Sequence, residues 1–221
     1  MRTISTIVAF ATIMILAATT TANAQERTAK VSRWSAGPIV GLNLAHFWGS
    51  DFNNDNAHLR VGPHFGGFVT WSNDRHYGVT MELLYSGKGS RYRSNNFLLG
   101  DFKSVTRMDY FEMPILFRYF FIQEGMVRPH ISAGPSLGFL LMANTESINP
   151  DGESRSIRDA TNVFDLGMNV GGGVNIRIKK IWINPEIRYN LGVLNAIEDQ
   201  AVRNGALTFA VGVGFPIGKI D

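Results

Sequence analysis

The chain has 221 residues, and its 21 Lys and Arg against 18 Asp and Glu leave a formal net charge of +3. A charge this close to balance does not indicate nucleic-acid binding. No cysteine is present, which excludes disulfide bonds, thiolate metal ligands and a lipid attached to cysteine. The 23 glycines and 15 phenylalanines suit β structure with short turns and aromatic anchors.

The first segment is typical of a secretory signal peptide. Arg2 provides a charged start, residues 4–18 are mostly apolar, and Ala22 to Ala24 form a small-residue cleavage site. The apolar run is shorter than the roughly 20 residues that a membrane-spanning helix needs. The expected organisation is a signal peptide at 1–24, a periplasmic lead-in at 25–35 and one folded domain at 36–221.

Eight later segments alternate apolar residues with polar residues or glycine. A period of two places successive side chains on opposite faces of a strand. The clearest case runs from Asp165 to Ile178, where the apolar residues share one parity and Gly, Asn, Asp and Arg share the other. Most segments are longer than an average soluble strand of about five or six residues. The expected strands are 36–47, 60–71, 76–88, 105–121, 127–142, 165–178, 181–194 and 206–217.

The connections between these segments alternate between long and short, beginning and ending with a long one. Outer-membrane barrels have short periplasmic turns, longer external loops and an even number of strands. A closed sheet also has no edge whose backbone groups would lie unpaired in hydrocarbon. The sequence therefore predicts an all-β fold: an eight-stranded antiparallel up-and-down transmembrane β-barrel in the cell outer membrane. Both ends of the barrel domain are expected on the periplasmic side.

Short motifs spread over most of the chain carry a family resemblance. They are Gly41 to Leu44, Glu82 to Tyr85 with Lys88-Gly89, Tyr110 to Pro114, Pro129 to Leu141, Gly167 to Asn175, Pro185 to Tyr189 with Gly192, and Gly205 to Phe215. In these motifs the chain resembles the outer-membrane β-barrel proteins of Bacteroidetes, the group often named PorT-like. The resemblance implies the barrel architecture. The founding member is linked to protein secretion, but the motifs do not transfer that role to this chain.

Charged residues occupy the polar parity of the expected strands and would therefore point into the barrel. An eight-stranded barrel is just wide enough for side chains to fill, and an unpaired charge there is costly. We predict that ion pairs and hydrogen bonds plug the lumen; a narrow gated path or a small-ligand site is the alternative. The residues of this network are Glu82, Lys88, Glu112, Arg118, Arg128, His130, Asp165, Arg177, Glu186 and Arg188.

The partners within this network must come from different strands. Glu112 and Arg118 lie six positions apart on one expected strand. That spacing is roughly 20 Å by strand rise, so they cannot pair with each other. Glu82 and Arg188 are available as partners from other strands.

No catalytic residue is expected. His130 and Ser132 lie two positions apart, which is similar to the His-x-Ser spacing of outer-membrane lipid A deacylases. A lipid esterase needs Ser, His and an acid within hydrogen-bond reach and facing the lipid. Both residues here share the lumen parity, which favours a non-enzymatic protein.

No metal or cofactor is expected either. Asp51, Asn53 and Asp55 begin like a calcium-binding loop, but Asn56 stands where that loop needs Gly and Gly62 where it needs Glu. The five histidines lack ligand spacing. The run of glycines at 171–173 lies inside a strand, so it is better explained as relief of crowding than as a phosphate-binding loop.

The leading hypothesis is an integral outer-membrane barrel without enzymatic activity that acts in envelope structure, adhesion or assembly through its long loops. One alternative is a narrow pore or transporter for small solutes. The other is a soluble periplasmic carrier of a lipophilic ligand, whose apolar residues would face inward. The expected partners of a monomeric barrel are outer-membrane lipid, lipopolysaccharide and envelope proteins, and not nucleic acid. The residues expected to contact lipopolysaccharide phosphates are Arg91, Arg93, Lys103 and Arg107.

Overall fold

The computed structural model describes one compact unit of the chain, within Val31–Asp221. The described residues are 33–50, 57–73, 76–96, 100–123, 125–147, 154–197 and 200–217. The predicted signal peptide and most of the lead-in lie outside them and stay predictions. No helix among the described residues is long and apolar enough to cross a membrane.

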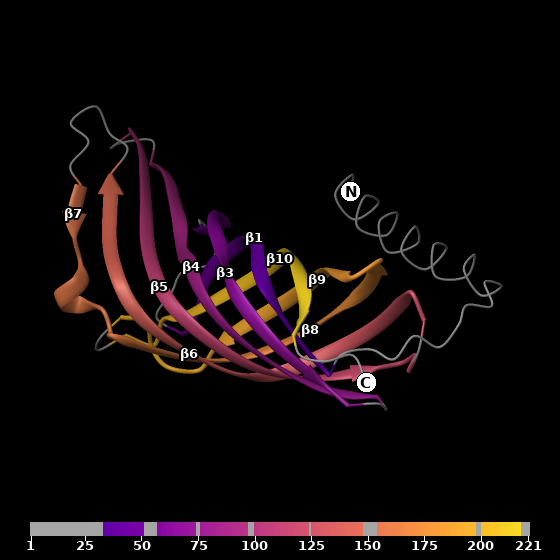
Figure 1. The fold of residues 1–221 in the computed structure, drawn as a ribbon. Helices are drawn as coiled ribbons and strands as arrows, with labels where there is room; N and C mark the ends of the chain where they lie inside the picture. Colours follow the sequence, from indigo (N-terminus) through magenta and orange to yellow (C-terminus); the bar gives the residue numbers. More distant parts are fainter. Residues whose placement is uncertain are drawn as a thin grey trace. The chain divides into compact units, whose positions relative to one another are not determined.

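Eight long strands form a closed antiparallel ring (Figure 1). Each pairs with its neighbours along the chain, and the first pairs with the last from Trp34↔Ile217 to Trp48↔Arg203. The predicted all-β, eight-stranded, up-and-down barrel is therefore confirmed. The strands of the ring are β1 (Trp34–Trp48), β3 (Arg60–Ser72), β4 (Tyr77–Asn96), β5 (Gly100–Phe120), β6 (Val127–Ser147), β8 (Phe164–Ile178), β9 (Ile181–Gly192) and β10 (Arg203–Ile217).

Three short elements lie beside the ring. β2 (Ala57–His58) pairs with β4, and β7 (Ser154–Ser156) pairs with β6. The 3-10 helix η2 (Arg158–Ala160) follows β7. All three belong to long connections, so they lie at the end of the barrel opposite the short turns.

The largest departure from the predicted strand limits is the segment 89–104, which was expected to be a polar loop. In the structure β4 and β5 continue through most of it and remain paired up to Asn96↔Gly100. Backbone hydrogen bonds extend the hairpin without needing an apolar face, which is why alternation does not reveal it. β6 also runs on to Ser147, and Figure 1 shows β4, β5 and β6 rising past their neighbours.

The two faces of the barrel wall have opposite chemistry. Large apolar side chains are exposed on the outer face, for example Val40 at 65% and Val170 at 61% of their full accessible area. The inner face buries polar and charged side chains such as Asn43, Thr80 and Arg188. A soluble carrier would bury the apolar face, so that alternative for this chain is wrong.

One β-bulge separates the regular barrel from the tall part of the sheet. The register between β5 and β6 shifts between Asp109 and Tyr110, where Asp109 pairs with Met142 and Tyr110 with Leu140. Leu141 and Met142 are both exposed as a result. A bulge of this kind bends its strand and increases the local twist.

Candidate functional site

A ring of ion pairs fills one level of the barrel interior. We call Glu82, Arg118, Glu186 and Arg188 the ion-pair ring. Arg188 Nη1 lies 2.8 Å from Glu82 Oε2, and its Nη2 lies 3.1 Å from Glu186 Oε1. Arg118 Nη2 lies 3.0 Å from Glu186 Oε2 and 3.9 Å from Glu82 Oε1. Each carboxylate thus lies between two guanidinium groups, and all four side chains are almost completely buried.

The barrel closure brings these four residues together. Glu82 lies on β4, Arg118 on β5, and Glu186 and Arg188 lie two positions apart on the inner face of β9. In the order of the ring, β4 and β9 are separated by three strands in either direction. The contact between Glu82 and Arg188 therefore crosses the full width of the lumen. Arg188 Nη2 also lies 3.4 Å from His64 Nε2 on β3.

A second cluster lies around Lys88, nearer the long connections. Lys88 Nζ donates hydrogen bonds to Asp165 Oδ2 at 3.0 Å, Asn190 Oδ1 at 3.0 Å and Glu112 Oε1 at 3.3 Å. Asn190 Nδ2 in turn donates to Glu112 Oε1 at 3.2 Å and to Ser136 Oγ at 3.0 Å. These five residues, the Lys88 cluster, come from five different strands and are all buried. A single ammonium group therefore contacts two buried carboxylates.

Glycines on β8 leave space for the wide side chains of β9. A Cβ atom on Gly171 would lie 2.6 Å from Arg188 Cγ and 2.3 Å from the carbonyl oxygen of Ile187. A Cβ atom on Gly173 would lie 2.8 Å from Glu186 Cβ. These inner glycines let the charged residues of β9 lie close to the neighbouring strand. The structure thus supports crowding relief as the reason for the glycine run.

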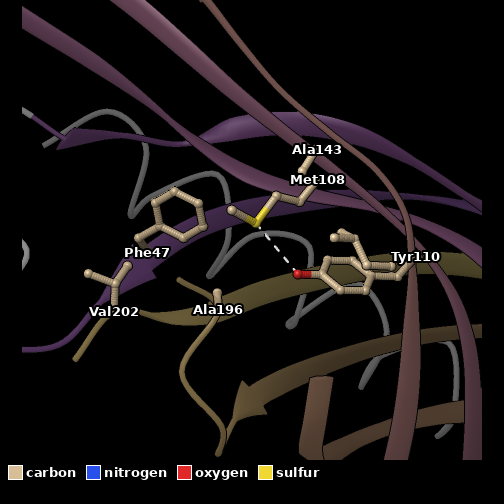
Figure 2. Packing of buried hydrophobic residues seen from close by; sticks show 7 residues of the cluster. Phe47, Met108, Tyr110, Ala143, Ala196 and Val202 are labelled. Carbon is tan, nitrogen blue, oxygen red and sulfur yellow. Dashed lines mark hydrogen bonds between the residues drawn. The ribbon is translucent and has the colours of Figure 1, made fainter. Parts of the chain in front are cut away.

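An apolar lid covers the Lys88 cluster at the end of the long connections. Figure 2 shows strand residues and residues of the β9–β10 connection packing into one buried group. Asn162 links the segment after η2 to this connection through two hydrogen bonds. Its backbone N–H donates to the carbonyl oxygen of Ala196 at 3.1 Å, and its Nδ2 donates to the backbone carbonyl oxygen of Asn195 at 2.8 Å. The lid consists of Phe47, Met108, Tyr110, Leu140, Ala143, Ala196 and Val202.

Tyr110 joins the lid to the charged layer below it. Its hydroxyl donates to the sulfur of Met108 at 3.5 Å, drawn as the dashed line in Figure 2, and accepts a hydrogen bond from Asn204 Nδ2 at 3.1 Å. Asn204 Nδ2 also lies 3.3 Å from Asp165 Oδ2. Lys88 Nζ lies 5.5 Å from the centre of the Tyr110 ring. Apolar packing and ion pairing are therefore continuous along the barrel axis.

The sequence does not predict the lid. Met108, Tyr110 and Leu140 lie on the inward parity of their strands, and this parity was the available signal. Ala196 and Val202 lie in a segment for which the sequence predicts only a polar connection. No periodic pattern indicates that such a segment folds back over the barrel.

The remaining residues of the predicted network lie apart from both clusters. Arg128 and His130 are buried near the short-turn end, where both contact the ring of Phe120. Arg128 Cζ lies 4.2 Å from the centre of that ring, and the ring centres of His130 and Phe120 are 5.4 Å apart. Arg177 is only half-buried and lies over the ring of Trp182 at 5.9 Å. The structure thus brings seven of the ten predicted residues into two clusters and places three nearer the opposite end.

The structure also locates the candidates for chemistry. His130 and Ser132 are both buried inside the barrel, away from the outer apolar face. The calcium-like loop start at 51–55 lies outside the described residues. Among the residues that are described, no group of three His, Asp or Glu side chains is placed to hold a metal ion.

The predicted basic residues lie on the extended part of β4 and β5. Arg91, Arg93 and Arg107 are exposed, and Arg107 Nη2 lies 3.0 Å from Glu146 Oε2. Lys103 pairs with Arg93 in the backbone register. A surface groove of about 590 Å³ runs beside these arginines.

A closed antiparallel barrel with an apolar outer wall and a charged interior defines an integral outer-membrane protein. The family model described as outer membrane protein beta-barrel domain matches residues 23–198. The chain therefore belongs to this family, and its location is the outer membrane.

Several solved outer-membrane proteins are similar at low identity. Neisserial surface protein A is 16% identical, with a TM-score of 0.45, over 84% of this chain and 98% of that one. Ail, the attachment invasion locus protein of Yersinia pestis, is 14% identical, with a TM-score of 0.40, over 82% and 98%. Outer membrane protein W of E. coli is 12% identical, with a TM-score of 0.42, over 85% and 99%. No curated protein sequence matches the chain significantly.

Proposed function

We propose that this chain is a monomeric, non-enzymatic and non-conducting outer-membrane barrel that acts in envelope structure, adhesion or assembly through its long-connection end. One observation carries the proposal: the interior is filled in successive layers by the ion-pair ring, the Lys88 cluster and the apolar lid. Strands β4, β5 and β6 rise past their neighbours at the long-connection end (Figure 1), so the proposal places the contact with other envelope components on this tall sheet. We also propose, on its sequence motifs, that the chain is a PorT-like protein of Bacteroidetes.

Conductance of the purified protein in a planar lipid bilayer tests the filled interior. We expect little or no steady current, because ions would have to displace paired charges from an interior that side chains already fill. A wide porin inserted under the same conditions controls for detection. Stable openings of nanosiemens size would overturn the proposal.

A narrow pore for small solutes is the second candidate. The short-turn half of the lumen favours it, because the buried polar atoms Ser132 Oγ and Asn175 Oδ1 have no hydrogen-bond partner among the described residues. Such atoms indicate a site for water. Under this alternative the same bilayer experiment gives small, frequent openings in the unmodified protein.

The loop-end role is tested by cross-linking in intact envelopes. Replacing residues 91–105 by a two-residue turn removes the upper β4–β5 hairpin and leaves the filled layers in place. Under the proposal, the full chain forms a specific cross-link to an envelope protein and the shortened chain does not. Equal cross-linking of both chains would exclude the hairpin as the contact surface.

A further inference from the structure

The outer face of β4 and β5 changes from apolar to basic along the barrel axis, while the outer face of neighbouring β3 stays apolar. Phe65, Leu83 and Phe111 are exposed in the apolar part. Beyond Gly89 on β4 the same outward parity carries Arg91 and Arg93. The change occurs toward the long connections, which in outer-membrane barrels lie outside the cell. In a barrel that spans the outer membrane with its long connections outward, this order places the basic part next to the headgroups of the outer leaflet.

The groove beside these arginines has a fixed basic group in its wall. Arg60 is buried, and its Nη1 donates to the carbonyl oxygen of Lys88 while its Nη2 lies 3.8 Å from Asp109 Oδ1. The backbone pairing of β3 with β4 ends at His64↔Ser86, so Arg60 occupies the place where these two strands are no longer paired. The groove is lined mainly by Arg60, Val61, Arg91, Tyr92, Val105 and Arg107.

The arginines on either side of the groove are close enough to bind one anion. Arg91 pairs with Val105, and Arg107 is two positions further along β5, so Arg91 and Arg107 are diagonal neighbours on one face. Such neighbours lie about 7 Å apart in a sheet. Arg107 also contacts Glu146, but both side chains are about half exposed, at 55% and 44%. An exposed pair of this kind is weak and is readily exchanged for a stronger anion.

We propose that this groove binds a phosphate of lipid A, the lipid anchor of lipopolysaccharide, with its acyl chains lying on the apolar wall below. The inference rests on the proposed function, because it requires the barrel to span the outer membrane with its long connections outward. Guanidinium groups recognise phosphate oxygens through paired, charge-assisted hydrogen bonds. Arg60, Arg91, Arg93 and Arg107 line the groove, and two of them each contact one carboxylate, Arg60 with Asp109 and Arg107 with Glu146. The groove therefore presents several guanidinium groups from three strands to one phosphate.

Native mass spectrometry of the detergent-solubilised full chain, titrated with lipid A, tests the site. The probes are lipid A with two phosphates, the same lipid A after enzymatic dephosphorylation, and phosphatidylglycerol. We expect the variant R91Q/R93Q/R107Q to bind phosphorylated lipid A at least about tenfold more weakly than the unmodified chain, because charge-assisted hydrogen bonds are lost. The unmodified chain should bind dephosphorylated lipid A as weakly as the variant binds the phosphorylated form.

A matched control removes the same charge elsewhere. Arg33, Lys179 and Lys180 are exposed at the short-turn end of the barrel, the end opposite the groove, and the variant R33Q/K179Q/K180Q should bind lipid A within about twofold of the unmodified chain. Equal weakening by both variants would mean nonspecific attraction and would overturn the site. Equal binding of phosphatidylglycerol and lipid A would overturn the choice of lipid A.

The bilayer current of each preparation separates this inference from the proposed function. Suppose that the unmodified chain conducts and that the groove variant, but not the control variant, binds lipid A weakly. The filled interior is then wrong and the lipid site stands. If the unmodified chain does not conduct and the groove variant binds lipid A normally, the lipid site is wrong and the proposed function stands. A heat-dependent shift in gel mobility confirms that each variant is folded before either measurement.

Discussion

Replacing Lys88 with methionine should be among the most damaging single changes in the barrel interior. The substitution keeps the approximate length of the side chain and removes its charge. Lys88 Nζ has three polar contacts, to Glu112, Asp165 and Asn190, at 3.0–3.3 Å. When the ammonium group is removed, Glu112 keeps its hydrogen bond from the side-chain amide of Asn190. Asp165 keeps its hydrogen bond from the side-chain amide of Asn204. Two buried carboxylates would then remain in the cluster without the cation that contacts both of them.

The expected loss of stability follows from this burial. Removing one partner of a buried ion pair costs about 3–5 kcal/mol, because the remaining charge stays away from water. Lys88 serves two carboxylates, so we expect K88M to lie at the upper end of that range. Replacing all three charges, in K88M/E112Q/D165N, should recover most of the loss because no unpaired charge remains.

Urea unfolding in lipid vesicles measures the difference, with the folded fraction taken from gel mobility without boiling. The matched control is R107M, which removes a cation from the half-exposed pair with Glu146. Such a pair contributes about 0.2–1 kcal/mol. A free energy of unfolding for K88M within about 1 kcal/mol of that for R107M would refute the assignment of Lys88 as the central cation of the interior.

Two further substitutions test the packing around the clusters. G171A should lower the free energy of unfolding by about 1–3 kcal/mol, because the new Cβ atom would clash with the backbone of β9 and with the Arg188 side chain. The control G67A, whose new Cβ atom would have its nearest neighbour 3.7 Å away, should change the free energy of unfolding by less than about 0.5 kcal/mol. Equal effects of the two substitutions would exclude crowding relief as the role of Gly171. V202D should destabilise the lid and produce brief currents in a planar bilayer, because a carboxylate would lie unpaired among apolar side chains. If V202D gives no current and leaves the unfolding midpoint unchanged, the lid does not seal the barrel.

The wall of the barrel was predictable because two physical demands coincide in it. Lipid requires apolar side chains outside, and the narrow lumen requires small or paired polar side chains inside. The alternation from Asp165 to Ile178 therefore appears almost unchanged as β8, Phe164–Ile178. The β4–β5 extension lacks this alternation, because exposed Arg91 and Arg93 take the outward positions that apolar residues occupy lower on β4. Its pairing up to Asn96↔Gly100 leaves no periodic mark in the sequence.

The composition of the interior was predictable, but its partners were not. Parity identifies Glu82, Lys88 and Glu112 as inward-facing residues. It does not say how far each strand is shifted along the barrel axis relative to the strand across the lumen. That shift decides that Glu82 meets Arg188 while Glu112 meets Lys88. The lid depends in addition on how the β9–β10 connection folds, and its key residue Val202 shows no pattern by which it could be recognised.

The ion pairs in turn explain how the sequence selects one barrel register. A slip of one residue between strands would turn every side chain to the wrong face, so the apolar alternation already excludes it. A slip of two residues keeps every face correct and moves the strand by only about 7 Å. That movement would separate Arg188 from Glu82, now 2.8 Å apart, and Lys88 from Asp165, now 3.0 Å apart. Because both contacts cross the lumen, they exclude the slips that the apolar wall permits, and the charged interior therefore contributes to the uniqueness of the fold.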